Sequence, residues 1–545
     1  MPPLPRPGTL KAPSRQQVMN RAGLRSGAGT VASRITGLLR LVMVAYALGG
    51  GGGTKGLGDP FNLANSTPNI IHDLVLGGVL GATFVPVFVN RLARSSRARA
   101  SESISAVVTL AAVGLVVATI LFELLAPEII HLYAFGTNSG AEQHVATELL
   151  RLFAPQLLFY GAISLMGAVL ATQDQFVAVG IVPVVNNIVC IIVLAIFASI
   201  DRTMSLAQIS NDTGAMVLLG LGTTAGVALQ AAALIPSMRR ASLHLRFIWR
   251  PSDPAVSSIL ALSGWTFGFV IANQIAVFVV LAMEYHLGSG NISAYTYAYA
   301  FFQLPFGVAA TAIVNVATPD LARAWNARDV TLMGKRFGTA LRQLLAVILP
   351  AMVAYLILAK PAVTLVLLHG QETSAQADLT AKVLVFFALG LPGYCVYFFA
   401  IRTFQAMRNT KVAFWCYVVE NGLNIGFAFA FYRPLGVKGL ALSYSIAYTV
   451  SAVIALALIR HRLGTMGGRA ILASSLRSFA LASGMAIVLA LVVTLTGTST
   501  GLVGWAKLVL ATVVGGAAYF GGAGLAGTLA ARGGLAPHGR HRRRG

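Results

Sequence analysis

Charged residues are scarce in this chain, and acidic residues are the scarcest of them. Only 10% of the 545 residues are Asp, Glu, Lys or Arg, and 17 of these are acidic, while 56% are hydrophobic and the mean hydropathy is +0.76. A typical soluble domain carries about 25% charged residues. The composition therefore excludes an ordinary soluble protein and predicts an all-α protein that crosses a membrane many times.

Cysteine and the common catalytic motifs are also lacking. The three cysteines, Cys190, Cys395 and Cys416, fall in apolar segments without C-x-x-C spacing, which is typical of core residues rather than of metal or redox sites. No H-E-x-x-H or G-x-S-x-G pattern occurs, and residues 53–56 lack the G-K-[ST] order of a phosphate-binding loop. We expect no catalytic residues, no enzymatic activity and no bound organic cofactor.

Apolar segments long enough to cross about 30 Å of hydrocarbon recur fourteen times. They lie near residues 28–49, 66–90, 102–125, 147–171, 177–199, 213–237, 256–284, 291–318, 337–359, 379–406, 411–431, 436–459, 474–497 and 501–527. Proline and glycine interrupt several of them, as at Pro183, at residues 305–307 and at residues 390–393. Such breaks suit helices that bend during transport, although membrane helices in general tolerate them.

The distribution of basic residues supports this arrangement of spans. With fourteen spans, 30 of the 40 Lys and Arg residues fall on the side that carries both termini, and eight fall on the opposite side. Basic loops stay on the cytoplasmic side of a membrane, so both termini are predicted to be cytoplasmic. The net charge of +23 then reflects topology and contact with anionic lipid headgroups. It does not indicate nucleic-acid binding.

Arg34 and Arg40 are the two remaining basic residues, and both lie within the first span. A cation at this depth costs at least about 2.5 kcal/mol, so it normally faces a water-filled cavity with an anionic partner. His72 and Asp73 lie within the second span. They either join the arginines in this cavity or form a structural ion pair that locks the first two helices together.

Three oxygen-bearing side chains meet in the eleventh span, where Glu420 is accompanied by Asn421 and Asn424. This group is either a site for Na⁺ or H⁺ coupling or a hydrogen-bonded contact between helices. A similar pattern, Asn186-Asn187, occurs six spans earlier. The match indicates two parallel repeats related by an axis along the membrane normal, which is a transporter feature.

Several motifs resemble those of the MurJ/MviN lipid II flippase family of the MOP superfamily. These motifs are Ser33-Arg34-Ile-Thr-Gly37-Leu-Leu-Arg40, Asp59-Pro-Phe, Pro68-Asn69, Gly81-Ala-Thr-Phe-Val-Pro86, Pro155-Gln-Leu-Leu-Phe-Tyr160-Gly, Pro183-Val-Val-Asn-Asn187 and Gln303-Leu-Pro-Phe-Gly307. Together with the fourteen spans they cover most of the chain.

The resemblance implies two pseudo-symmetric six-helix lobes around a cationic cavity, with two final helices that form a groove for a polyprenyl tail. It implies these boundaries: N-terminal tail 1–27, first lobe 28–237, linker 238–255, second lobe 256–460, tail groove 474–527 and basic tail 528–545.

The resemblance also implies the substrate-binding residues. Arg34 and Arg40 match the arginines of the family's first helix, Asp59 matches the acid that begins its second helix, and Asn69 and Gln303 lie in shared motifs. Two positions differ from the family.

At these two positions, His72-Asp73 and Ala300 replace arginines that many members carry. A pyrophosphate would then rest mainly on Arg34 and Arg40, with help from His72 if that side chain is protonated.

The resemblance implies a lipid II flippase of the bacterial cytoplasmic membrane, with lipid II and membrane lipids as partners and cell-wall synthesis proteins as further candidates. Three alternatives remain open. The first is a flippase for another polyprenyl-linked glycan, and the second is a cation-coupled drug exporter, whose cavity should contain several acids. The third is a membrane scaffold that recruits cell-wall enzymes.

Overall fold

The computed structural model describes residues 15–50, 56–72, 84, 87–88, 97–134, 140–173, 176–200, 206–240, 246–497 and 501–533. Helices are the regular structure in all of these segments, as the composition predicts. Ten described helices are long and apolar enough to cross a membrane, or eleven if one bent pair counts as a single span. The count of fourteen spans stays a prediction.

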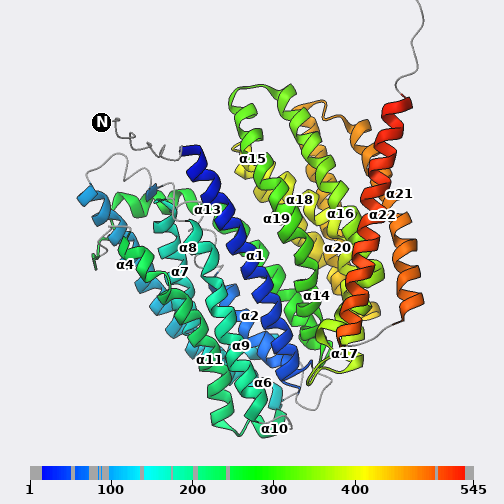
Figure 1. The fold of residues 1–545 in the computed structure, drawn as a ribbon. Coiled ribbons are helices and arrows are strands. Elements are labelled where there is room, and N and C mark those ends of the chain that lie inside the picture. Colours follow the sequence, from blue (N-terminus) through cyan, green and yellow to red (C-terminus); the bar gives the residue numbers. More distant parts are fainter. Residues whose placement is uncertain are drawn as a thin grey trace, which may run out of the picture.

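The first half of the chain forms one group of helices, seen on the left of Figure 1. Its members are α1 (Arg15–Leu48), α2 (Gly58–His72), α4 (Arg97–Leu124), α5 (Ala126–Tyr133), α6 (Gly140–Phe153), α7 (Gln156–Ala171), α8 (Phe176–Ile181), α9 (Pro183–Ile200), α10 (Leu206–Ile209), α11 (Thr213–Ala232) and α12 (Ile235–Arg240). Within this lobe α1 packs on α9, and α9 packs on α11.

The second half forms the other lobe, most of which lies on the right of Figure 1, while its first helix, residues 254–286, begins beside the helices of the first lobe. It contains α13 (Pro254–His286), α14 (Asn291–Pro305), the π-helix η3 (Phe306–Ala310), α15 (Thr311–Asn326), α16 (Val330–Leu367), α17 (Ser374–Leu389), α18 (Leu391–Ala406), α19 (Thr410–Leu435) and α20 (Val437–Leu463). Here α13 packs on α19 and α19 packs on α20. The packing order of the first lobe thus recurs six spans later.

The last two helices, α21 (Gly468–Thr496) and α22 (Gly501–Gly533), pack on each other and against α16 at the edge of the second lobe. Both expose long rows of Leu, Ile, Val and Phe side chains. In a protein that crosses a membrane, such rows face lipid.

The predicted proline and glycine breaks are confirmed as breaks between helices. Pro183 begins α9 with one residue, Val182, between it and the end of α8, and Pro305 is followed by the π-helix η3. At Gly390 the chain bends by 49° between α17 and α18. Proline lacks the backbone N–H that a continuous helix uses in its hydrogen bonds. The series of backbone hydrogen bonds is therefore interrupted at Pro183 and Pro305.

Helix starts depend on short polar side chains that cap them. The carboxylate of Asp329 accepts a hydrogen bond from the N–H of Leu332 at the start of α16, and Asn409 does the same for Val412 at the start of α19. Each cap satisfies one of the N–H groups that a helix leaves unpaired. The three cysteines are free and buried, as expected of core residues.

Candidate functional site

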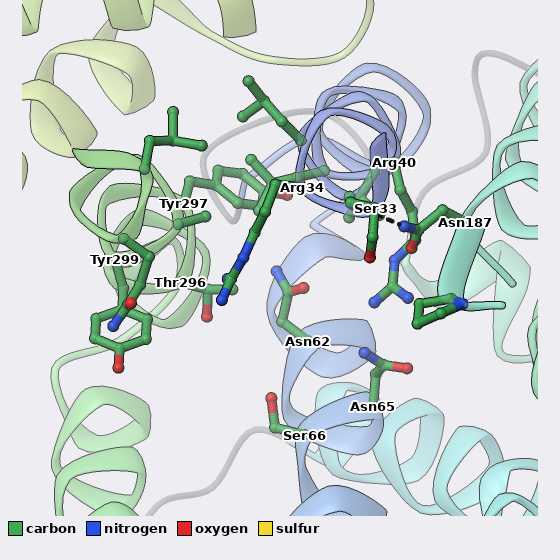
Figure 2. Close-up of a pocket in the computed structure, with 18 of the residues that line it drawn as sticks. Ser33, Arg34, Arg40, Asn62, Asn65, Ser66, Asn187, Thr296, Tyr297 and Tyr299 are labelled. Atoms are coloured by element: carbon green, nitrogen blue, oxygen red, sulfur yellow. Dashed lines mark hydrogen bonds between the residues drawn. The ribbon is translucent and has the colours of Figure 1, made fainter. Parts of the chain in front are cut away.

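A cavity of about 450 Å³ lies between the two lobes, bounded by α1, α2, α9 and α14. Figure 2 shows its polar side chains pointing toward a common space. The lining residues from the first lobe are Ser33, Arg34, Gly37, Leu38, Arg40, Leu41, Val44, Phe61, Asn62, Asn65, Ser66, Pro183 and Asn187. Those from the second lobe are Thr296, Tyr297, Tyr299, Ala300, Gln303 and Leu304.

Arg34 and Arg40 both line this cavity, as the sequence predicts. Arg34 points toward α14, whereas the guanidinium of Arg40 lies near Asn65 and Asn187 (Figure 2). Neither arginine forms an ion pair with any residue in the described part of the chain. Both guanidinium groups are therefore available to an anion that enters the cavity.

Gly307, in the π-helix, makes room for Arg34. A Cβ atom added at Gly307 would lie 3.3 Å from the Nε atom of Arg34, closer than ordinary van der Waals contact. A π-helix carries an extra residue in one turn and often occurs at functional sites. Here it brings backbone without a side chain against the arginine.

Neutral hydrogen-bonding groups complete the wall. Asn62, Asn65 and Ser66 are spaced three and four residues apart, so they lie on one face of α2. Asn187 of α9 donates its Nδ2 hydrogen bonds to the hydroxyl of Thr36 (3.0 Å) and, at 3.3 Å, to the carbonyl of Ser33. Amides in these positions suit a ligand rich in hydroxyl and amide groups.

Gln303 and Ala300 supply the part of the wall formed by α14. Gln303 lines the cavity as predicted, and its Nε2 donates to the hydroxyl of Tyr394 over 3.3 Å. Ala300 contributes only a methyl group. Among the described residues of the lining there are two arginines and no carboxylate, so the cavity attracts anions.

The other residues predicted on the second span lie elsewhere. The Nε2 atom of His72 is 3.0 Å from the hydroxyl of Ser164 on α7, and Asn69 donates to the carbonyl of Asn65. The structure does not bring either side chain to the lining of the cavity. Asp73 lies outside the described residues, so its predicted pairing with an arginine stays a prediction.

Asp59 also lies outside the cavity, in a contact that joins the two lobes. Its carboxylate accepts hydrogen bonds from the N–H groups of Gly290 and Ser293 at the start of α14. Asn62 adds a hydrogen bond to the Ser293 hydroxyl over 3.1 Å. Asp59 is 1% exposed. In this structure Asp59 thus holds the two lobes together and does not line the cavity.

A second set of contacts lies beside Asp59 and also crosses between the lobes. Glu372, in the loop between α16 and α17, accepts a hydrogen bond from the N–H of Gly50 over 2.7 Å. The N–H of Gln371 donates to the carbonyl of Tyr46 over 3.0 Å. We call the four segments that meet here the clasp: residues 46–50 and 58–62 of the first lobe, and residues 290–293 and 370–376 of the second.

Glycines allow the backbones of the clasp to approach closely. A Cβ atom at Gly370, where φ is +66°, would lie 2.3 Å from the carbonyl oxygen of Tyr46. One at Gly58 would lie 1.9 Å from the carbonyl oxygen of Gly49. A side chain at Gly370 would force the lobes apart, whereas one at Gly58 would clash within the first lobe and also with the Ser293 hydroxyl of the second lobe. The close approach of these backbones thus closes one end of the space between the lobes.

Glu372 places a buried carboxyl group within the clasp. Its Oε1 atom is buried without a hydrogen-bond partner in the described structure. Burial raises the pKa of Glu372 to about 7, the Gly50 N–H lowers it, and the nearby charge of Asp59 raises it. Its protonation state therefore changes near neutral pH.

A second cavity, of about 330 Å³, is lined mainly by the second lobe and shares Ser66, Thr296 and Tyr299 with the first. The remaining lining residues are Asn273, Ala276, Val277, Val280, Leu281, Glu284, Tyr295, Glu420, Asn421, Asn424, Tyr444 and Tyr448. All three residues predicted for a cation site thus meet here. Among the described lining residues there are two carboxyl groups and no cation, the reverse of the first cavity.

The hydrogen bonds of this second cavity leave oxygen atoms for a further ligand. Asn421 donates its Nδ2 to the carbonyl of Tyr417, so its Oδ1 remains an acceptor. Asn424 accepts a hydrogen bond from Ser443 over 3.2 Å. Carboxylate, amide and phenol oxygens suit a hard cation or a proton. Within the described residues no group of three or more His, Cys, Asp or Glu side chains forms a metal site.

Several cavity residues were not predicted from the sequence, and the clearest of them are Asn62, Asn65 and Ser66. Their helical spacing on an otherwise apolar segment was the available signal. Glu284 was also missed, because it lies near the end of a long apolar helix and has no acidic neighbour in sequence.

The family model and the similar proteins of known sequence all carry the same description. A family model described as "Lipid II flippase MurJ" matches residues 45–511, which begin after Arg34 and Arg40. The probable lipid II flippase MurJ of Rickettsia prowazekii (strain Madrid E) is 25% identical over 452 residues, covering 82% of this chain and 85% of the relative. That of Haemophilus influenzae is 26% identical over 441 residues, covering 78% and 83%.

Two solved structures share the fold. One is described as lipid II flippase MurJ in an inward closed conformation; its TM-score is 0.74 at 23% identity, covering 92% of this chain and 98% of that one. The other is an inward-facing multidrug resistance transporter of the MATE family in the MOP superfamily. Its TM-score is 0.64 at 15% identity, covering 80% and 98%.

Proposed function

This chain belongs to the lipid II flippase MurJ family, and from that premise we propose that it moves lipid II from the inner to the outer leaflet of the bacterial cytoplasmic membrane. The observation that carries the proposal is the cavity between the lobes, whose lining has two arginines and no carboxylate among the described residues. A cavity of this polarity suits a pyrophosphate and disfavours the organic cations that a drug exporter carries.

In this mechanism the two arginines bind the pyrophosphate. Arginine pairs with phosphate oxygens through charge-assisted hydrogen bonds that are roughly twice as strong as neutral ones. Arg34 and Arg40 approach from different parts of α1, so one diphosphate would lie between them. The amides of Asn62, Asn65 and Asn187 would bind the sugar and peptide groups of the substrate.

The polyprenyl tail would remain in the lipid phase. The helices α21 and α22 expose apolar side chains along the edge of the second lobe, and residues 474–527 would form the groove for the tail. Residues 28–237 and 256–460 would move as two lobes joined by the linker 238–255. The tails, 1–27 and 528–545, would both be cytoplasmic, as the distribution of basic residues predicts.

The clasp would then close the periplasmic side, and alternating access would require it to open. The second cavity would couple this movement to an ion gradient, with Glu420, Asn421 and Asn424 as ligands for Na⁺ or H⁺. Tyr299 of α14 lines both this cavity and the first one, so α14 would respond to occupancy by a cation. A cation bound in the second cavity would contribute only its positive charge.

Depletion of the protein in cells tests this function. We expect lipid II to accumulate in the inner leaflet, measured as loss of accessibility to an impermeant reagent that acts on outer-leaflet lipid II. Normal accessibility with mislocalised cell-wall synthases would instead support the scaffold alternative. Normal lipid II accessibility with loss of another polyprenyl-linked glycan from the outer leaflet would identify a different substrate.

A further inference from the structure

A groove of about 540 Å³ lies between α15 and α16, apart from both cavities described above. It is formed by two neighbouring helices of the second lobe, which meet at the hairpin at the upper end of Figure 1. Its lining residues are Ala312, Ile313, Val316, Ala317 and Asp320 from α15, with Lys335, Arg336, Thr339, Ala340 and Gln343 from α16. We call it the α15–α16 groove.

The charged side chains of the groove lie at one end, and the other end is mainly apolar, with Gln343 as a polar exception. Lys335 and Arg336 lie near the hairpin, as does Asp320 on the facing helix, whereas Ala312 and Val316 lie one to three turns farther from it. A phospholipid has the same order, with a charged headgroup at the membrane surface and apolar chains below it.

The polar end is positive. The carboxylate of Asp320 already pairs with Arg323, and Arg336 donates to the backbone carbonyl of Asp320 over 3.1 Å. Within the described residues neither Lys335 nor Arg336 forms an ion pair. Two cations thus remain for an anionic group from outside the protein.

We propose that the α15–α16 groove binds an anionic phospholipid of the inner leaflet. This assignment rests on the membrane orientation of the proposed function, which places the hairpin on the cytoplasmic side. The phosphate would contact Lys335 and Arg336, and an acyl chain would lie along Ala312 and Val316. The side chain of Val316 is 75% exposed, so nothing in the described protein covers this part of the groove.

The location of the groove favours a phospholipid over lipid II. Its volume is within the roughly 300–1,000 Å³ of small-ligand sites, which suits a glycerophosphate. Both walls belong to one lobe. The groove therefore keeps its shape when the lobes move, as a permanently bound lipid requires.

The test measures binding of phosphatidylglycerol and phosphatidylcholine to the purified full chain by native mass spectrometry. Two basic residues near a membrane surface contribute enough attraction for roughly 30-fold tighter binding of the anionic lipid. The variant with Lys335→Ala and Arg336→Ala should lose this preference. The matched control, with Lys411→Ala and Arg462→Ala, removes two exposed charges from other helices and should keep it.

A second variant tests the apolar end without changing charge. Val316→Trp would fill the groove and should lower the occupancy of both lipids. The proposal is overturned if the Lys335 and Arg336 variant binds phosphatidylglycerol like the wild type, or if the control loses binding equally. It is also overturned if Val316→Trp changes nothing, or if millimolar inorganic phosphate displaces the lipid. None of these measurements depends on transport of lipid II.

Discussion

Replacing Asp59 by Asn should open the clasp. Each oxygen of the Asp59 carboxylate accepts one backbone N–H across the lobes, from Gly290 and from Ser293. An Asn side chain offers one accepting oxygen and places its NH₂ group against the other N–H. One buried donor is then left without an acceptor.

The expected magnitude follows from that single loss. An unsatisfied buried N–H costs about 1–3 kcal/mol, and removal of the buried charge offsets the lost attraction to the start of α14. A net change of about 2 kcal/mol corresponds to a shift of roughly 30-fold in the equilibrium between closed and open clasp. A conformation with the clasp open, rare in the wild type, should become readily detectable.

Spin labels across the clasp measure this shift. Asn211→Cys, just after α10, and Ser374→Cys, at the start of α17, are exposed sites on opposite lobes. Both helices lie toward the lower end of Figure 1. With the three native cysteines replaced, double electron–electron resonance should show one short distance in the wild type. In Asp59→Asn a population at longer distance should be added.

The control removes the same type of interaction from a site within one lobe. Asp329→Asn changes an aspartate that caps α16 and should leave the label distances unchanged. Our reasoning about the clasp is refuted if Asp59→Asn retains the distance distribution of the wild type while folded. It is refuted equally if Asp329→Asn opens the clasp to the same extent.

Three further predictions concern other residues of the two cavities and the clasp. The pKa of Glu372 is raised to about 7 in the closed clasp. Protonated Glu372 therefore favours closure below its ordinary pKa of about 4.5, and this stabilisation of the closed clasp is lost as pH rises through 7. Label distances measured from pH 5 to 8 should lengthen in the wild type but not in Glu372→Gln. Gly307→Val should crowd Arg34 and weaken lipid II binding roughly tenfold, about 1.4 kcal/mol, in a titration where Gly422→Val, which meets open space, changes nothing. Glu420→Gln should abolish the dependence of translocation on an ion gradient while lipid II binding stays intact; a retained dependence would remove Glu420 from the coupling site.

Residues whose chemistry is unusual for their surroundings could be located from the sequence. Arg34 and Arg40 are charges in an apolar segment, and desolvation leaves them few positions except a cavity wall. Glu420 and Asn421 follow the same reasoning. The helix breaks could also be predicted, because proline and glycine alter the conformation of the backbone at their own positions.

The role of Asp59 could not be predicted in the same way. Its partners are the backbone N–H groups of Gly290 and Ser293, and backbone donors leave no side-chain pattern in a sequence. The partner of His72 was hidden for a related reason, because Ser164 lies on another helix 92 residues away. Contacts between lobes depend on how whole helices are placed, and the periodicity of one segment does not contain that information.

Translocation of lipid II by the purified protein in vesicles tests the central claim most directly. The wild type should move lipid II between leaflets, and Arg34→Ala or Arg40→Ala should each slow translocation by at least tenfold, since an arginine–phosphate interaction contributes about 1.5–3 kcal/mol. Lys411→Ala, which removes an exposed charge outside the cavity, should translocate like the wild type. Unchanged translocation in the double variant of Arg34 and Arg40 would contradict the account.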